Sequence, residues 1–146
     1  MKRSEINRII IQAKEFFRSM GFHLPPWAFW APEEWKGRYE DCSEIVDNML
    51  GWDVTPFGGT DFKKRGLLLF TLRNGNPRTE EKPYAEKIMI VEENQETPMH
   101  FHWSKMEDII NRGGGNLVIE LFASKADGTF SNEPFTVSID GIKKKL

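Results

Sequence analysis

The stretch that decides the fold is residues 98–107, which runs Pro98-Met99-His100-Phe101-His102-Trp103-Ser104-Lys105-Met106-Glu107. On an extended strand, alternate side chains project to the same face about 7 Å apart, so His100 and His102 can converge on one ion. Phe101 and Trp103 then face the other way. Glu107 follows after an intervening turn that is long enough to bring its carboxylate back towards the imidazoles. The segment therefore predicts a strand that ends in a metal site.

The donor set of this site indicates a divalent transition-metal ion but does not select one metal. Two neutral imidazoles and one carboxylate suit Mn²⁺, Fe²⁺, Co²⁺, Ni²⁺ or Zn²⁺, and they leave coordination positions open for water or substrate. The alternative is that His100 and His102 are ordinary strand histidines held by hydrogen bonds, because a bare His-x-His pair often occurs without a metal. The third histidine, His23, precedes Pro25 near the N-terminus and is not assigned as a ligand.

Strand patterns surround this segment on both sides. Short apolar or alternating runs predict strands at Gly66 to Leu72, Glu86 to Glu92, Pro98 to Trp103, Asn116 to Ser124 and Phe135 to Ile139. Asn74-Gly75 and Asp127-Gly128 are typical hairpin turns, and Asp140-Gly141 is expected as a turn after the last strand. Short strands at this spacing indicate an antiparallel barrel or sandwich.

The first fifty residues predict helices instead of strands. Apolar residues recur at helical spacing over residues 5–20, with Ser4 as the expected N-cap and Gly21 as the terminator. Shorter helices or turns are expected to follow. We therefore predict one structural domain in which a helical preface, residues 1–50, precedes a β-barrel portion, residues 51–146.

Aromatic residues crowd into the middle of this preface, at Trp27, Phe29, Trp30 and Trp35. Such rings offer flat apolar surfaces that can stack on a sugar, but clusters of this kind more often seal a core. Core packing is therefore the preferred interpretation.

Composition narrows the class of partner. Lys and Arg total 20 against 22 Asp and Glu, so the field is too weak to gather nucleic acid or anionic lipid, and a small polar ligand fits better. Cys42 is the only cysteine, which excludes an internal disulfide, favours a reducing cytoplasm and is expected to be buried. No apolar run approaches the ~18 residues of a membrane span, and the N-terminus does not predict a signal segment.

Three stretches of the sequence resemble the cupin D-lyxose isomerases: Tyr84 to Val91, Thr97 to Gly115 and Asn116 to Leu121. The helical preface resembles that family more weakly. The resemblance implies a mainly β fold, a cupin-type antiparallel jelly roll, and an aldose–ketose isomerase acting on D-lyxose and D-xylulose, with D-mannose and D-fructose as a second pair. It also implies that His100, His102 and Glu107 bind a manganese-type ion, Mn²⁺, and that Lys105 transfers protons.

Two features depart from the cupin pattern. Cupins usually have a glycine six residues before the first histidine, where this chain has Asn94, a residue that also adopts the left-handed turn conformation. Such cupins add a fourth ligand, a histidine on a later strand, but no histidine follows His102 before Leu146. We therefore expect a barrel that lacks its C-terminal strands.

Three further polar residues are candidates with alternatives. Strand parity groups Lys87 with Met89, opposite Ile88, so Lys87 either contacts substrate oxygens or lies on a solvated edge. Glu120, in an otherwise apolar strand, either contacts substrate or faces solvent. Lys105 is either the proton-transfer residue or a solvated turn lysine.

Other functions remain open at this level. A phosphosugar isomerase would need a cationic phosphate pocket, and a dioxygenase would need non-haem iron. A non-catalytic cupin would bind sugar or metal without converting it. Cupin barrels often pair through their sheets, so we also expect a homodimer.

Overall fold

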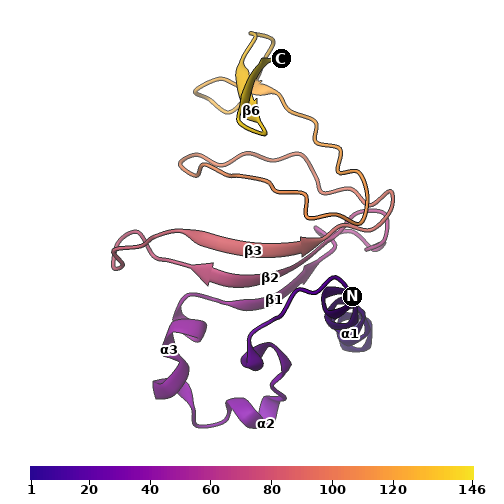
Figure 1. Ribbon diagram of the computed structural model, residues 1–146, viewed down its shortest axis with the longest axis vertical. Coiled ribbons are helices and arrows are strands. Elements are labelled where there is room, and N and C mark those ends of the chain that lie inside the picture. Colours follow the sequence, from indigo (N-terminus) through magenta and orange to yellow (C-terminus); the bar gives the residue numbers. More distant parts are fainter. The chain divides into compact units, whose positions relative to one another are not determined.

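The computed structural model describes all residues from 1 to 146. The chain divides into two compact units, Met1–Pro98 and Met99–Leu146. The boundary therefore lies after the last residues of the N-terminal sheet region, and the helical preface shares its unit with that sheet (Figure 1). None of the helices combines the length and the apolarity that crossing a membrane would require.

Helix α1, Arg3–Ser19, has the apolar face that its periodicity predicts. Ala13 and Phe17 are buried on this face. The predicted Ser4 cap is wrong: Ser4 lies inside the helix, because the Glu5 carboxylate accepts a hydrogen bond of 2.6 Å from the backbone N–H of Lys2 and so caps the first turn one residue earlier.

The end of α1 is a Schellman motif, as the position of a glycine after the helix suggests. Gly21 has φ +71°, and its N–H donates to Arg18 O at 3.1 Å. The N–H of Phe22 donates to Phe17 O at 2.8 Å, and the two phenyl rings lie 5.8 Å apart. This turn ends the helix and leads into the aromatic segment.

The rest of the preface consists of short helices: η1 (Pro26–Phe29), α2 (Pro32–Trp35) and α3 (Tyr39–Asp47). Trp27 stacks on Phe70 of the sheet with ring centroids 4.9 Å apart, and Trp30 meets Trp35 edge to face at 4.9 Å. The core-packing interpretation of the aromatic cluster is therefore confirmed for Trp27. Cys42 is buried and reduced, as expected.

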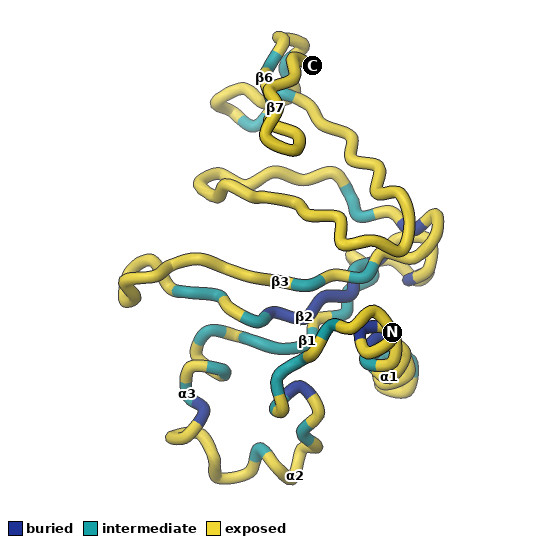
Figure 2. Tube along the Cα trace, in the orientation of Figure 1, coloured by how far each residue is buried: buried dark blue, intermediate teal, exposed yellow.

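A three-stranded antiparallel sheet in the order β1-β2-β3 forms the centre of the first unit. Its strands are β1 (Gly51–Thr55), β2 (Leu67–Asn74) and β3 (Ala85–Ile90). The central strand holds a run of buried residues, Leu68-Leu69-Phe70-Thr71. Strand β2 is buried most deeply because it alone has a partner on each side (Figure 2).

One face of this sheet packs against the helices. Trp52, Phe70 and Ile88 lie opposite one another across the three strands on this face. The Trp52 indole N–H donates to Ala28 O at 3.0 Å, which ties the sheet to η1. A core cluster contains Ala13, Phe62 and Leu68, with Ile9, Trp52, Val54 and Ile90 packed against it.

The second unit contains two small hairpins. Strands β4 (Ala123–Ser124) and β5 (Phe130–Ser131) flank the predicted turn at Asp127-Gly128. Strands β6 (Thr136–Ile139) and β7 (Ile142–Lys145) are joined by Asp140-Gly141, with φ +51° and +79°. The prediction that Asp140-Gly141 follows the last strand is wrong, because two successive positive φ values form a hairpin turn that the next strand continues.

One predicted strand around the two histidines is absent from the structure, and another is reduced to two residues. Residues 99–122 have no regular secondary structure, so the strand expected at Pro98 to Trp103 is missing, and only Ala123–Ser124 forms of the strand expected at Asn116 to Ser124. No strand ladder includes residues 98–103 or 116–122, and a strand requires one. The structure is mainly antiparallel sheets with a few helices and contains no closed barrel.

Candidate metal centre

The predicted ligands lie within the irregular segment of the second unit. The rings of His100 and His102 are neighbours, with centroids 5.1 Å apart and planes at 81°. His102 Nε2 lies 3.6 Å from Glu107 Oε1, so the turn between them returns the carboxylate to the imidazole as the spacing predicts. These three side chains therefore lie together, although the strand that was predicted to carry the two histidines is not formed.

The intervening aromatic residues pack with each other and with a hairpin. Phe101 and Trp103 meet edge to face with centroids 4.6 Å apart. A Cβ placed on Gly128 would lie 3.0 Å from Phe101 and 3.3 Å from Trp103, so only glycine fits this turn without displacing the rings. The β4–β5 turn thereby supports the segment that carries the two histidines.

Lys105 sets the electrostatics of the site. Its ammonium forms an ion pair with Glu107 Oε1, the same oxygen that faces His102. The hydrogen bond from Lys105 lowers the pKa of Glu107 below its usual value, and the charges of Lys105, His102 and His100 act in the same direction against partial burial. Glu107 is therefore a carboxylate at neutral pH, the form that a metal ligand requires.

The donor chemistry fits a divalent cation, but the three groups do not form a coordination shell. Two donors bound to one tetrahedral ion at about 2.1 Å lie roughly 3.4 Å apart, close to the 3.6 Å between His102 Nε2 and Glu107 Oε1. No group of three or more His, Cys, Asp and Glu side chains in the structure has a metal-binding arrangement. The Lys105 ammonium contacts Glu107 Oε1, the oxygen that a cation would bind.

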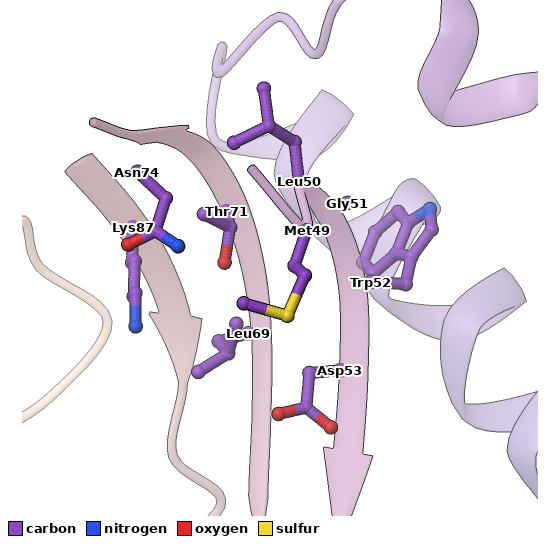
Figure 3. Close-up of a pocket in the computed structure, with 9 residues that line it drawn as sticks. All are labelled: Met49, Leu50, Gly51, Trp52, Asp53, Leu69, Thr71, Asn74 and Lys87. Atoms are coloured by element: carbon purple, nitrogen blue, oxygen red, sulfur yellow. The ribbon is translucent and has the colours of Figure 1, made fainter. Parts of the chain in front are cut away.

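The other two predicted site residues lie apart from this cluster in the sequence and differ in their surroundings. Lys87 belongs to β3 of the first unit and extends over the face of the sheet opposite the helices (Figure 3). The alternation of the strand puts Met89 on the same face, as predicted. Glu120 is exposed, lies outside any strand and forms none of the ion pairs of the structure. The substrate-binding roles of both residues stay predictions.

A polar hollow next to Lys87 was not expected from the sequence. Its lining includes Asp53, Thr71 and Asn74. The signal that could have identified Asp53 is the alternation of Trp52, Asp53, Val54 and Thr55, which puts the polar side chains opposite the core face.

The turn before the metal segment contains a residue in the left-handed conformation. Asn94, which occupies the position where cupins usually have glycine, has φ +58°. The expected left-handed conformation is therefore confirmed. Gln95 fixes this turn, because its amide donates to Phe62 O at 2.7 Å and accepts from the Glu92 N–H at 3.1 Å.

Comparison with known proteins decides the family. The model of the D-lyxose isomerase family matches residues 1–146. The chain belongs to the D-lyxose isomerase family. The resemblance inferred from residues 84–121 therefore extends over the whole chain.

Two curated relatives are named D-lyxose/D-mannose isomerase. The protein from Serratia proteamaculans is 48% identical over 147 residues, which cover 99% of this chain and 64% of the relative. The protein from Escherichia coli O157:H7 is 49% identical over 148 residues, which cover 99% of this chain and 65% of the relative. The chain thus spans about 64% of the length of these relatives.

Proposed function

We propose that this chain provides the metal- and sugar-binding part of an aldose–ketose isomerase that interconverts D-lyxose and D-xylulose, and D-mannose and D-fructose. The observation that carries the proposal is the grouping of His100, His102 and Glu107 in a chain that the D-lyxose isomerase family matches throughout. The names of the two relatives support the choice of sugars.

The metal proposed for this site is Mn²⁺, bound by His100, His102 and Glu107. A divalent ion held there would stabilise the negative charge that develops on the sugar oxygens during isomerisation. The 3.6 Å between His102 Nε2 and Glu107 Oε1 supports this role, because two donors to one ion lie about that far apart. His100 and His102 would supply imidazole nitrogen donors beside the carboxylate.

Lys105 is the proposed proton-transfer residue. Isomerisation moves one proton from C2 to C1 of the sugar and another from the C2 oxygen to the C1 oxygen, so that the carbonyl moves from C1 to C2. The ion pair with Glu107 holds the Lys105 ammonium beside the histidines, where it would donate a proton to a sugar oxygen as charge develops. Lys87 and Glu120 are proposed to contact other sugar oxygens.

The finer structural expectations belong to the same proposal. Antiparallel sheets behind a helical preface support a cupin jelly roll. The free thiol of Cys42 suits a cytoplasmic enzyme. The homodimer is proposed on the family resemblance alone.

The activity test uses the full chain, Mn²⁺ and a panel of pentoses and hexoses, with ketose formation as the readout. D-xylulose should form from D-lyxose, and His102→Ala should reduce the rate by about 100-fold or more, as expected when a metal ligand is removed. His23→Ala is the matched control, since His23 lies in the preface and should leave the rate unchanged. Binding of D-lyxose without ketose formation would contradict the proposal and favour a sugar-binding cupin.

A further inference from the structure

The end of β2 carries the only Asn-Gly step of the chain, Asn74-Gly75. This dipeptide is typical of a two-residue hairpin turn, but the structure has no such turn here. Asn74 pairs with Ala85, and the Gly75 N–H donates to Tyr84 O at 3.0 Å, so the pairing of the two strands continues past Asn74. A loop, residues 75–84, joins β2 to β3 (Figure 1).

The fold requires glycine at position 75. A Cβ added to Gly75 would collide with the Lys82 carbonyl oxygen and would lie 2.9 Å from Pro83 Cα. Both are backbone atoms, so a larger residue would have to displace the returning arm of the loop. The close approach of the two arms therefore keeps a glycine directly after Asn74.

An Asn-Gly step is chemically reactive. The backbone nitrogen of Gly75 can attack Cγ of Asn74, because glycine has no Cβ to obstruct the approach. The new nitrogen–carbon bond closes a succinimide ring, and the side-chain amide nitrogen leaves as ammonia with the proton that the backbone nitrogen loses. Water then opens the ring at either carbonyl and leaves aspartate or isoaspartate. Water is the only other reactant.

The structure restrains both reacting groups. The Gly75 N–H must leave Tyr84 O before its nitrogen can lose a proton and attack. The Asn74 amide donates to Asn48 O at 2.9 Å, which holds this side chain against the residue that follows α3. The reaction therefore requires local opening of the loop, and its rate follows the fraction of time that the loop is open.

One side-chain hydrogen bond holds the loop closed. Asn48 Nδ2 donates to Glu80 Oε1 at 2.7 Å. No other side-chain hydrogen bond or ion pair joins residues 75–84 to the rest of the structure. Asn48 therefore binds the reactive side chain of Asn74 through its backbone oxygen and the loop through its side chain.

The product of the reaction would not keep the contact with α3. Deamidation replaces the amide donor of Asn74 with a carboxylate that faces the Asn48 carbonyl oxygen, so a hydrogen bond becomes a repulsion between two acceptors. Asn74 also lines a hollow with Glu44 and Glu80, where a further negative charge is unfavourable.

We propose that Asn74 is a deamidation site, that the Asn48–Glu80 hydrogen bond slows its conversion, and that conversion releases the turn after α3 from the end of β2. All of these residues belong to the first unit. The proposal goes beyond the proposed isomerase function and depends on neither metal nor sugar.

The test incubates the full chain at neutral pH without metal and follows each asparagine by peptide mapping with mass spectrometry. Asn74 should convert faster than any other asparagine, and more slowly in the folded chain than in urea. Glu80→Ala should speed conversion of Asn74 about fivefold, the effect of losing one exposed hydrogen bond. Glu81→Ala is the matched control, because Glu81 is the next carboxylate of the loop and forms no such bond; its rate should equal that of the wild type.

A second measurement tests the effect of the product. Asn74→Asp should increase amide hydrogen exchange at residues 48–50, which follow α3. Asn76→Asp is the matched control, because it adds the same charge to the loop but keeps the side-chain oxygen that accepts from the Arg78 N–H. It should exchange like the wild type.

Two results would overturn the proposal. Equal conversion of Asn74 in the wild type and in folded Glu80→Ala, or faster conversion of another asparagine, would exclude the restrained deamidation site. Wild-type exchange at residues 48–50 in Asn74→Asp would exclude the release of the turn.

Discussion

Strand β2 in the first unit and residues 116–121 in the second unit have equally apolar sequences but different structures. Phe70 in β2 is 0% exposed, whereas Val118 is 90% exposed. Strand β2 has a partner strand on each side and helices on one face, but residues 116–121 have no ladder. An apolar β pattern therefore becomes a buried strand only where neighbours supply backbone hydrogen bonds and a covering layer.

The largest effect should come from removing the centre of the well-packed region. Phe70→Ala should lower the free energy of unfolding by about 3–5 kcal/mol, because a fully buried ring leaves a cavity against Trp27 and Trp52. Urea denaturation followed by tryptophan fluorescence measures this loss. Phe130→Ala, at a position that is 64% exposed, should cost less than about 1 kcal/mol. Equal losses in both variants would break the comparison.

The next largest effect should be a loss of isomerase rate on changing Lys105, which lies in the irregular segment of residues 99–122. Lys105→Met should slow conversion of D-lyxose by about 100-fold, the usual scale for losing one proton-transfer group. Initial rates of D-xylulose formation measure the loss. Lys125→Met removes a lysine next to β4 in the same unit and should change the rate little. A Lys105→Met enzyme with the wild-type rate would exclude Lys105 from proton transfer.

A smaller effect is expected from replacing one glycine in each unit, because the two glycines differ in backbone conformation. Gly21→Ala should cost about 1 kcal/mol of stability, because Gly21 has φ +71° in the Schellman turn. Gly115→Ala should cost almost nothing, since Gly115 is not in the left-handed region and nothing lies within 4 Å of an added Cβ. Thermal unfolding of the two variants makes the comparison. A greater loss in Gly115→Ala would mean that residues 99–122 are more tightly packed than the structure shows.

The smallest expected change is a shift in one titration. Lys105→Met should raise the pKa of Glu107 towards its ordinary value, because the lysine hydrogen bond is the main cause of its lowering. The lowered pKa favours the folded form above the usual titration range of a carboxylic acid, and this contribution is lost as pH falls through the lowered pKa. Carbon NMR of the Glu107 carboxyl group measures the titration. No shift would show that the lysine contact is not kept in solution.

Periodicity predicted the first helix and the two longest strands, but it missed the short strands β1 and β5. Helix α1 and strands β2 and β3 lie within a few residues of their expected bounds. Strand β7 was missed because Lys143, Lys144 and Lys145 give no apolar alternation, and it exists through the Asp140-Gly141 turn and its pairing with β6. Residues 99–103 failed as a strand because pairing depends on partners that no local pattern reveals.

The candidate site was predictable to a similar degree. The His-x-His spacing identified His100 and His102, and the return of Glu107 followed from the length of the intervening turn. The contact between Lys105 and Glu107 could not be derived from spacing, since it depends on the side-chain conformations within an irregular turn.

The most direct test of the account is a titration of the full chain with Mn²⁺, followed by electron paramagnetic resonance of the free ion. The wild type should bind one Mn²⁺ per chain, and Glu107→Gln should weaken that binding by tenfold or more while His23→Ala leaves it unchanged. Equal Mn²⁺ affinity in the wild type and Glu107→Gln would contradict the claim that two imidazoles and this carboxylate share one cation.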